Sequence, residues 1–130
     1  ESFGRLTSLE TLVLSFNQLT KLPETIGCLT SLKYLQLFQN QLTKLPESIE
    51  LLISLEKLDL GDNELTSVPD SIAEMPCLVS LWVQHNKLTS LPDPILKWKY
   101  PKLYLVGNTK KLYEMYRKVR KNTRKKFKPP

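Results

Sequence analysis

The acids and potential nucleophiles of this 130-residue chain offer few combinations that could do chemistry. Asp59 and Asp62 could approach one another on one strand, where paired carboxylates share a proton or bind a basic group. On the open face of a sheet, paired acids favour a basic partner over acid–base catalysis. His85 is the single histidine, so the sequence excludes a metal site built on paired histidines.

The motifs that bind phosphates or carry covalent catalysis are missing from the sequence. It contains no GxxxxGK[ST] or GxGxxG glycine loop and no GxSxG nucleophile turn. Cys28 and Cys77 lie outside any CxxC pair. They are 49 residues apart, which is two periods of the 23-residue repeat described below plus three residues, so they should lie about 10 Å apart and we expect no disulfide between them. We therefore predict that the chain is not an enzyme and has no catalytic residues, metal site, cofactor or small-molecule substrate.

Cations are concentrated near the C-terminal end of the sequence. Residues 1–108 contain nine lysines and arginines against twelve acids, a net charge of −3, whereas residues 109–130 contain ten against one, a net charge of +9. Such a run could attract nucleic acid, an anionic membrane or a nuclear import receptor, and it could equally be a solvated terminus. This basic tail includes Arg117, Lys118, Arg120, Lys121, Arg124, Lys125 and Lys126.

A repeated unit must position all of these residues. Copies of one octapeptide, NQLTKLPE in the first two occurrences, recur every 23 residues, beginning at Asn17, Asn40, Asn63 and Asn86. A fixed period in the twenties is typical of stacked supersecondary units. Ahead of the octapeptide, apolar residues such as Leu12 and Leu14 alternate with variable ones, the pattern of a short strand with one buried face. Each repeat should therefore add one strand to a parallel sheet.

Each repeat should then turn out of the sheet and return through a Leu-Pro or Val-Pro pair. The turn begins at an asparagine, at positions Asn17, Asn40, Asn63, Asn86 and Asn108. We expect each amide to bond backbone groups that have left the sheet, and stacked asparagines to bond one another as a ladder. Proline resists regular helix, so the return half should be extended or made of short helical turns.

The consensus of these units, LxxLxLxxNxLxxLPxxIxxL, resembles the leucine-rich repeat. It is most similar to the 23-residue cytosolic type of Ras-suppressor-like proteins and of Erbin, Densin and Scribble, and the resemblance covers residues 1 to about 108. It implies an α/β-type solenoid with a parallel concave sheet of about five short strands and an irregular or short-helical convex side. It also implies that the concave face grips another protein, and it implies no catalytic activity.

The start of the chain aligns with the interior of a repeat. Residues 1–6 match residues 24–29, so the array opens in mid-repeat, and we expect a fragment of a longer array. Toward the other end, Trp98 takes the position of Leu29 and Leu52, which indicates a large core residue.

A helix should close the array at its C-terminal end. Leu112, Met115, Tyr116 and Val119 recur at i, i+3, i+4 and i+7, which predicts an amphipathic capping helix over residues 110 to about 121. The sequence thus divides into a repeat domain, residues 1–108, and a basic cap helix and tail, residues 109–130.

The strand period indicates which side chains the scaffold leaves free. On the concave face we predict a partner-binding surface that consists of Tyr34, Gln36, Phe38, Lys57, Asp59, Asp62, Trp82, Gln84, His85 and Tyr104. Its aromatic members should supply most of the binding energy. Lys57, Asp59 and Asp62 should orient the partner through charged hydrogen bonds.

These features predict a non-catalytic protein–protein interaction module whose partner is another protein. Two alternatives stay open: an adaptor whose basic tail binds nucleic acid or anionic membrane, and the recognition domain of a larger enzyme. The sequence has no signal-like start, N-x-S/T sequon or cysteine-rich flank, so we expect a cytoplasmic protein, or a nuclear one if the basic tail directs import.

Overall fold

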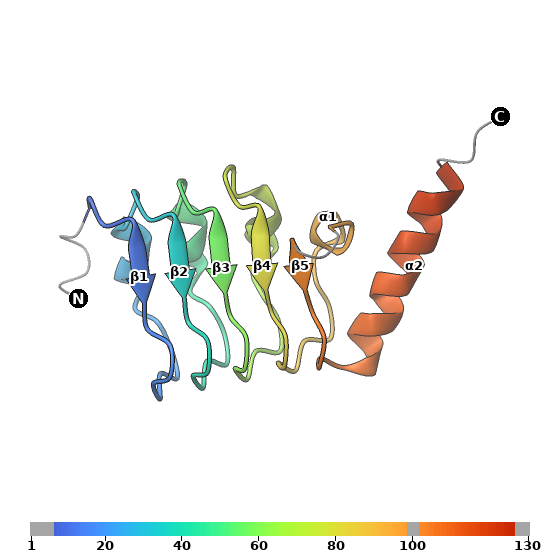
Figure 1. The fold of residues 1–130 in the computed structure, drawn as a ribbon, viewed down its shortest axis with the longest axis horizontal. Coiled ribbons are helices and arrows are strands. Elements are labelled where there is room, and N and C mark those ends of the chain that lie inside the picture. Colours follow the sequence, from blue (N-terminus) through green and yellow to red (C-terminus); the bar gives the residue numbers. More distant parts are fainter. Residues whose placement is uncertain (1–6, 99–101, 127–130) are drawn as a thin grey trace.

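The computed structural model describes residues 7–98 and 102–126, with side chains described as far as Asn122. Short parallel strands form a 5-stranded sheet in the order in which they follow along the chain (Figure 1). They are β1 (Thr11–Val13), β2 (Tyr34–Gln36), β3 (Lys57–Asp59), β4 (Ser80–Trp82) and β5 (Leu103–Tyr104). The register pairs equivalent positions of neighbouring repeats, as Leu35 with Leu58. The predicted strand in each repeat is confirmed.

Short helices return the chain behind the sheet (Figure 1). They are η2 (Glu24–Cys28), η3 (Glu47–Leu51), η4 (Asp70–Glu74) and α1 (Asp93–Leu96). Each begins directly after the proline of its repeat, and Pro23 and Pro46 have extended backbone angles. With ψ of 151° at Pro23 and 149° at Pro46, these prolines lie outside the helix, which starts at the next residue. The prediction of short helical turns on this side is confirmed.

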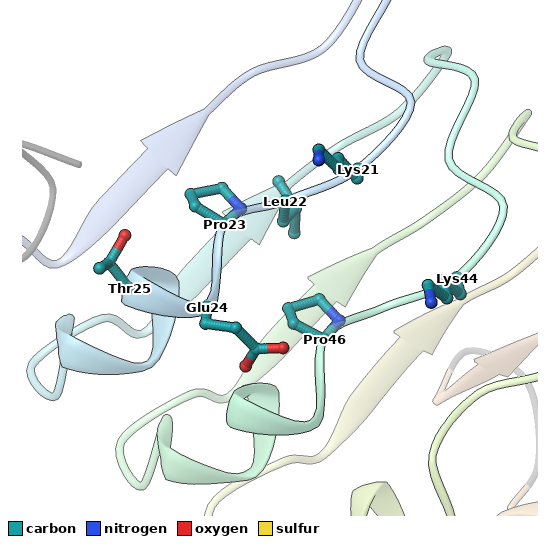
Figure 2. Close-up of a pocket in the computed structure, with 7 residues that line it drawn as sticks. All are labelled: Lys21, Leu22, Pro23, Glu24, Thr25, Lys44 and Pro46. Carbon is teal, nitrogen blue, oxygen red and sulfur yellow. The ribbon is translucent and has the colours of Figure 1, made fainter.

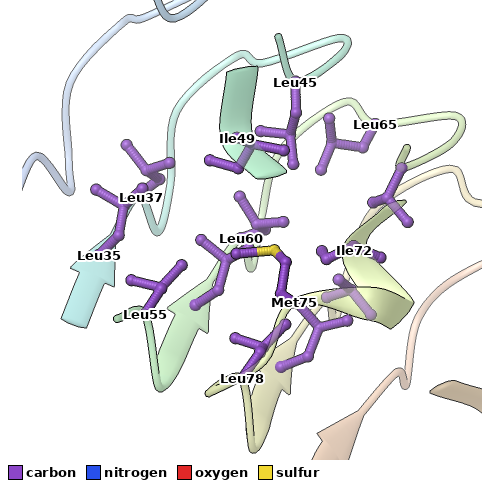
Figure 3. Packing of buried hydrophobic residues seen from close by; sticks show 14 of the residues in the cluster. Leu35, Leu37, Leu45, Ile49, Leu55, Leu60, Leu65, Ile72, Met75 and Leu78 are labelled. Atoms are coloured by element: carbon purple, nitrogen blue, oxygen red, sulfur yellow. The ribbon is translucent and has the colours of Figure 1, made fainter. Parts of the chain in front are cut away.

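The apolar core lies between the sheet and these helices. Leu35, Leu58 and Leu60 from the strand side are fully buried, and Ile49 from η3 and Ile72 from η4 are buried against them. Figure 3 shows strand-side leucines meeting isoleucines of the short helices. Because burying one such side chain is worth about 1.5–3 kcal/mol, the stacked repeats supply the stability that no single repeat could.

From Asn40 onward, the asparagine at each turn holds the preceding repeat to its own. Asn63 accepts a hydrogen bond from the Leu42 N–H at Oδ1 (3.0 Å), and its Nδ2 donates to the carbonyls of Leu37 (3.0 Å) and Leu60 (3.1 Å). The same pattern recurs at the equivalent positions Asn40, Asn86 and Asn108. The expected bonds to backbone groups are confirmed, but the expected ladder between asparagines is wrong, because backbone groups occupy both ends of the amide.

The residue before each of these asparagines has a left-handed backbone. The φ angles are 59° at Phe16, 57° at Gln39, 52° at Asp62, 53° at His85 and 79° at Gly107. Such a conformation costs a residue other than glycine about 1–2 kcal/mol, and here the bonds of the following asparagine hold it. This turn places the side chains of Asp62 and His85 at the lower edge of the sheet, by which we mean the edge at the C-terminal ends of the strands.

Helix α2 (Lys110–Lys126) follows the last strand at the end of the array (Figure 1). Leu112 is fully buried, and Met115, Tyr116 and Val119 pack against the core, which confirms the predicted inner side of the helix. The helix continues to Lys126, beyond the predicted end near 121. Its first turn is capped by Thr109, whose hydroxyl accepts from the Leu112 N–H (3.2 Å) and donates to the Leu88 carbonyl (2.6 Å).

Much of the predicted basic tail is therefore the outer side of a helix. Arg117, Lys118 and Lys121 are exposed, and the Arg120 guanidinium lies 5.3 Å from the ring centre of Tyr116. The last three members, at 124–126, lie in the final turns of α2, where only the backbone is described. Trp98 packs against the core as predicted but is only partly buried.

Candidate functional site

The open face, by which we mean the side of the sheet turned away from the short helices, corresponds to the predicted concave face. Pairing across the strands aligns Val13, Gln36, Asp59, Trp82 and Tyr104, which we call the central row. These residues alternate with the buried leucines and are all at least partly exposed. The structure places four of the predicted residues, Gln36, Asp59, Trp82 and Tyr104, in this row. Their role in binding stays a prediction.

Two further rows flank the central row on the open face. Above it, Tyr34 is paired with Lys57. Below it, toward the C-terminal ends of the strands, Phe38 and Gln84 converge over Gly61. A Cβ on this glycine would fall 2.2 Å from Nε2 of Gln84 and 3.0 Å from Cδ2 of Phe38. A larger residue at position 61 would therefore push Gln84 aside. Sequence reasoning missed this close approach, although a lone glycine in a row of larger side chains was a signal for it.

Asp59 is the acidic residue in the middle of the central row. Its Oδ1 accepts a hydrogen bond from the Gly61 N–H (3.0 Å). Burial raises the pKa of the Asp59 carboxyl, the bond from Gly61 lowers it, and the nearby charge of Asp62 raises it; the net pKa is above the ordinary value. Burial also raises the pKa of Tyr34, and the charge of Asp59 adds to that rise.

The raised pKa of Asp59 makes the stability of the fold decrease as the pH rises. The protonated side chain favours the fold, so its contribution is complete below the ordinary pKa and is lost as the pH rises through the pKa of the folded state. The ionised carboxylate at neutral pH thus opposes folding. In the described part of the chain, the ion pairs join Lys33 to Glu10 and Lys87 to Glu64, and neither pair compensates the negative charge of Asp59.

The two ends of the open face expose apolar side chains. At β1, Val13 and Phe16 are exposed, and the ring of Phe16 meets that of Phe38 edge to face with centroids 5.4 Å apart. Beyond β5, Val106 and Tyr113 line a groove of about 420 Å³, together with Tyr104, Leu105, Gly107, Asn108, Thr109 and Lys110. Tyr113 was missed because it lies off the apolar stripe of α2, so no periodic signal marked it.

The remaining predicted residues lie at the lower edge. His85 is exposed and packs beside Gly107, where a Cβ would fall 2.2 Å from its Nδ1. Asp62 is partly exposed, near enough to Asp59 to influence its pKa. All ten predicted side chains thus belong to the open face or its lower edge.

A second hollow lies away from the open face. Figure 2 shows it between the Leu-Pro segments of the first two repeats, with a volume of about 530 Å³ and a lining of Lys21, Leu22, Pro23, Glu24, Thr25, Lys44 and Pro46. Its lining contains no aromatic side chain of the kind that anchors a protein partner, whereas the open face has several. We therefore take the open face as the candidate site.

The described residues contain neither a cluster of metal ligands nor a helix that could span a membrane. Among residues 7–98 and 102–122, no three His, Cys, Asp or Glu side chains are grouped closely enough to hold a metal ion. The helices in the described part of the chain are all too short or too polar to span a membrane.

Comparison with known proteins gives consistent matches. A family model described as a leucine-rich repeat region matches residues 24–100, and a second, described as leucine rich repeat, matches residues 1–42. Among curated proteins, no sequence matches the chain.

Solved structures with a similar fold come from several organisms. An LRR protein of Leptospira interrogans shares 37% identity (TM-score 0.73; 83% of this chain and 28% of that chain). InlP of Listeria monocytogenes shares 35% (0.61; 75% and 26%), and the LRR ectodomain of the receptor kinase SOBIR1 of Arabidopsis thaliana shares 28% (0.69; 82% and 61%). The chain thus spans between about a quarter and three fifths of these relatives.

Proposed function

This chain belongs to the leucine-rich repeat family, and from that premise we propose that it is a non-catalytic module that binds a protein on its open face. Domains of this family generally mediate protein–protein interaction. One observation carries the choice of face: the open face gathers aromatic rings and an acid, Asp59, whose ionised form opposes folding. Side chains that the fold does not need, collected on one surface, are typical of a binding site.

Site-specific photocross-linking tests this proposal. A photoreactive phenylalanine analogue replaces either Val106, 50% exposed at the end of the open face, or Leu51, 52% exposed on η3 at the opposite side. The two positions match in exposure and in apolar character. After irradiation in cells, we expect a discrete protein adduct from position 106 and none from position 51. Adducts from position 51 alone would place the interface on the helical side and contradict the proposal.

The basic outer side of α2 supports a second candidate, an adaptor for nucleic acid or anionic membrane. Arg117, Lys118 and Lys121 are exposed there, and dense positive charge attracts phosphate groups. The third candidate, the recognition domain of a larger enzyme, would use the same open face as the first. It depends on residues outside this chain.

Truncation separates the first two candidates. Among the α2 side chains that the structure describes, Val119 is the last that packs on the core, so removing residues 122–130 should leave the cap in place. We expect the protein partner to stay bound at physiological salt, where charges more than about 8 Å away are screened. Titration of partner binding at low and physiological salt checks this. Binding that disappears with residues 122–130 and falls steeply with salt would favour the adaptor instead.

We also propose the cytoplasm as the setting of this module, or the nucleus if the basic outer side of α2 is read by an import receptor. Cys28 and Cys77 support a reducing compartment, because both are exposed free thiols.

A further inference from the structure

The centre of the open face has a chemistry different from that of its ends. In the central row, Asp59 is paired with Trp82 on one side and with Gln36 on the other. Asp62 adds a second negative charge nearby. An acidic centre beside an indole ring, between two apolar ends, is complementary to a cation carried on an otherwise apolar segment.

We propose that this centre receives an arginine side chain of the partner protein, stacked on Trp82 and hydrogen-bonded to Asp59. The inference rests on the proposed function and names the group that the open face recognises. The guanidinium donates to Oδ2 of Asp59, because Oδ1 already accepts from the Gly61 N–H. It lies flat against the indole, where the ring quadrupole attracts the cation.

The carbonyl oxygen of Gln84 supplies a further acceptor beside this position. Oε1 of Gln84 is buried and has no hydrogen-bond partner, although its amide lies against Gly61, whose N–H bonds Asp59. A buried acceptor without a donor is costly. Because the rest of the Gln84 side chain is partly exposed, a rotation of the amide would present this oxygen to a donor on the face.

These groups favour arginine over lysine. A guanidinium is planar, donates in several fixed directions, sheds water easily and stacks on aromatic rings. An ammonium is a strongly hydrated point charge, so it is more costly to desolvate at this position and cannot stack flat on the ring. A neutral side chain would leave Asp59 desolvated and unpaired, which penalises such a partner.

The spacing of the central row indicates the kind of segment that carries the arginine. Neighbouring strands lie about 4.8 Å apart, so the row from Val13 to Tyr104 spans about 19 Å, the length of about six extended residues. Asp59 is in the middle of this row. The segment should therefore place its arginine between two apolar residues, which reach Val13 at one end and the groove beside Val106 at the other.

Selection from random peptides tests the inference without a known partner. Peptides of about 12 residues, twice the span of the row, are selected by display on the immobilised 130-residue chain. The best binders are synthesised with arginine, lysine or neutral citrulline at each cationic position. Their Kd values are measured by calorimetry against the wild type, Asp59→Asn and the matched control Asp70→Asn, which makes the same change on the exposed start of η4.

We expect the selected peptides to share an arginine whose replacement by citrulline weakens binding to the wild type by about tenfold or more, and by lysine somewhat less. Against Asp59→Asn, the arginine and citrulline peptides should bind within about threefold of each other. Asp70→Asn should keep the full arginine preference. Asparagine retains the oxygen that accepts from Gly61, and a melting curve at or above that of the wild type confirms that Asp59→Asn is folded.

The other outcomes overturn the inference in distinguishable ways. If peptides lose affinity with Trp82→Ala but show no arginine preference, or keep it in Asp59→Asn, the arginine site is wrong and the proposed function stands. If the selection returns no binder, or binders indifferent to Trp82→Ala, both the inference and the proposed function fail.

Discussion

Asn63→Ala is expected to lower the free energy of unfolding by about 1–3 kcal/mol, a large effect for one polar side chain. The alanine leaves the buried Leu42 N–H without its acceptor. The Leu37 and Leu60 carbonyls each lose one amide donor but keep a second, from Asn40 and Asn86 respectively. Each orphaned buried group costs about 1–3 kcal/mol. Urea denaturation of the wild type and the variant, compared at equal m-values, measures the loss.

Two other asparagines serve as controls for this prediction. Asn17 is exposed and, within the described residues, donates to the Leu14 and Ser15 carbonyls of its own repeat, so Asn17→Ala should cost clearly less than Asn63→Ala. Asn122 is exposed on α2, and its replacement by alanine should change stability by less than about 0.5 kcal/mol. Equal losses at all three positions would contradict the role that the structure gives to the bonds between repeats.

Trp82→Ala is expected to weaken binding of the protein partner by about 2 kcal/mol or more, roughly 30-fold, as central aromatic anchors do. The fold should survive, because Trp82 points away from the core while its neighbours Leu81 and Val83 are buried. The partner identified by cross-linking at position 106 provides the titrant. Calorimetry measures its affinity, and circular dichroism measures the melting temperature of each variant.

Trp98→Ala provides the opposite control. Trp98 packs against the core but is only partly buried, so its loss should cost about 2–3 kcal/mol of stability, toward the lower end for a large aromatic truncation. Affinity of the folded protein should be unchanged. If instead Trp82→Ala binds as the wild type does, the open face is not the site that holds the partner.

Much of the fold could be predicted because the same sequence pattern recurs in every repeat. The alternation around Leu12, Leu35 and Leu58 predicted one strand per repeat, and the structure pairs these three leucines in register. The end of α2 could not be predicted in this way. Apolar periodicity stops at Val119, but the lysines and arginines that follow are good helix formers and carry the helix to Lys126.

The candidate site was predictable in outline but not in its chemistry. The alternation of side chains along a strand predicted that Asp59 and Trp82 lie on the same face of the sheet, because this alternation does not depend on neighbouring residues. The raised pKa of Asp59 depends on how closely the surrounding side chains approach it, which no spacing within one repeat encodes. The approach of Phe38 and Gln84 over Gly61 likewise joins three repeats. Properties that arise between repeats appear only when the repeats are stacked.

The bonds of the turn asparagines all have the same direction along the chain. The acceptor oxygen of Asn63 serves an N–H of the preceding repeat, at Leu42, and Asn86 serves Leu65 in the same way. A repeat is thus completed by the one made after it. On a ribosome, which releases the N-terminal end first, the newest repeat stays unfinished until the next 23 residues have emerged. Each repeat would then finish folding only after the following repeat has been synthesised. Asn108 and Thr109 complete the fourth repeat by bonding the backbone of Leu88.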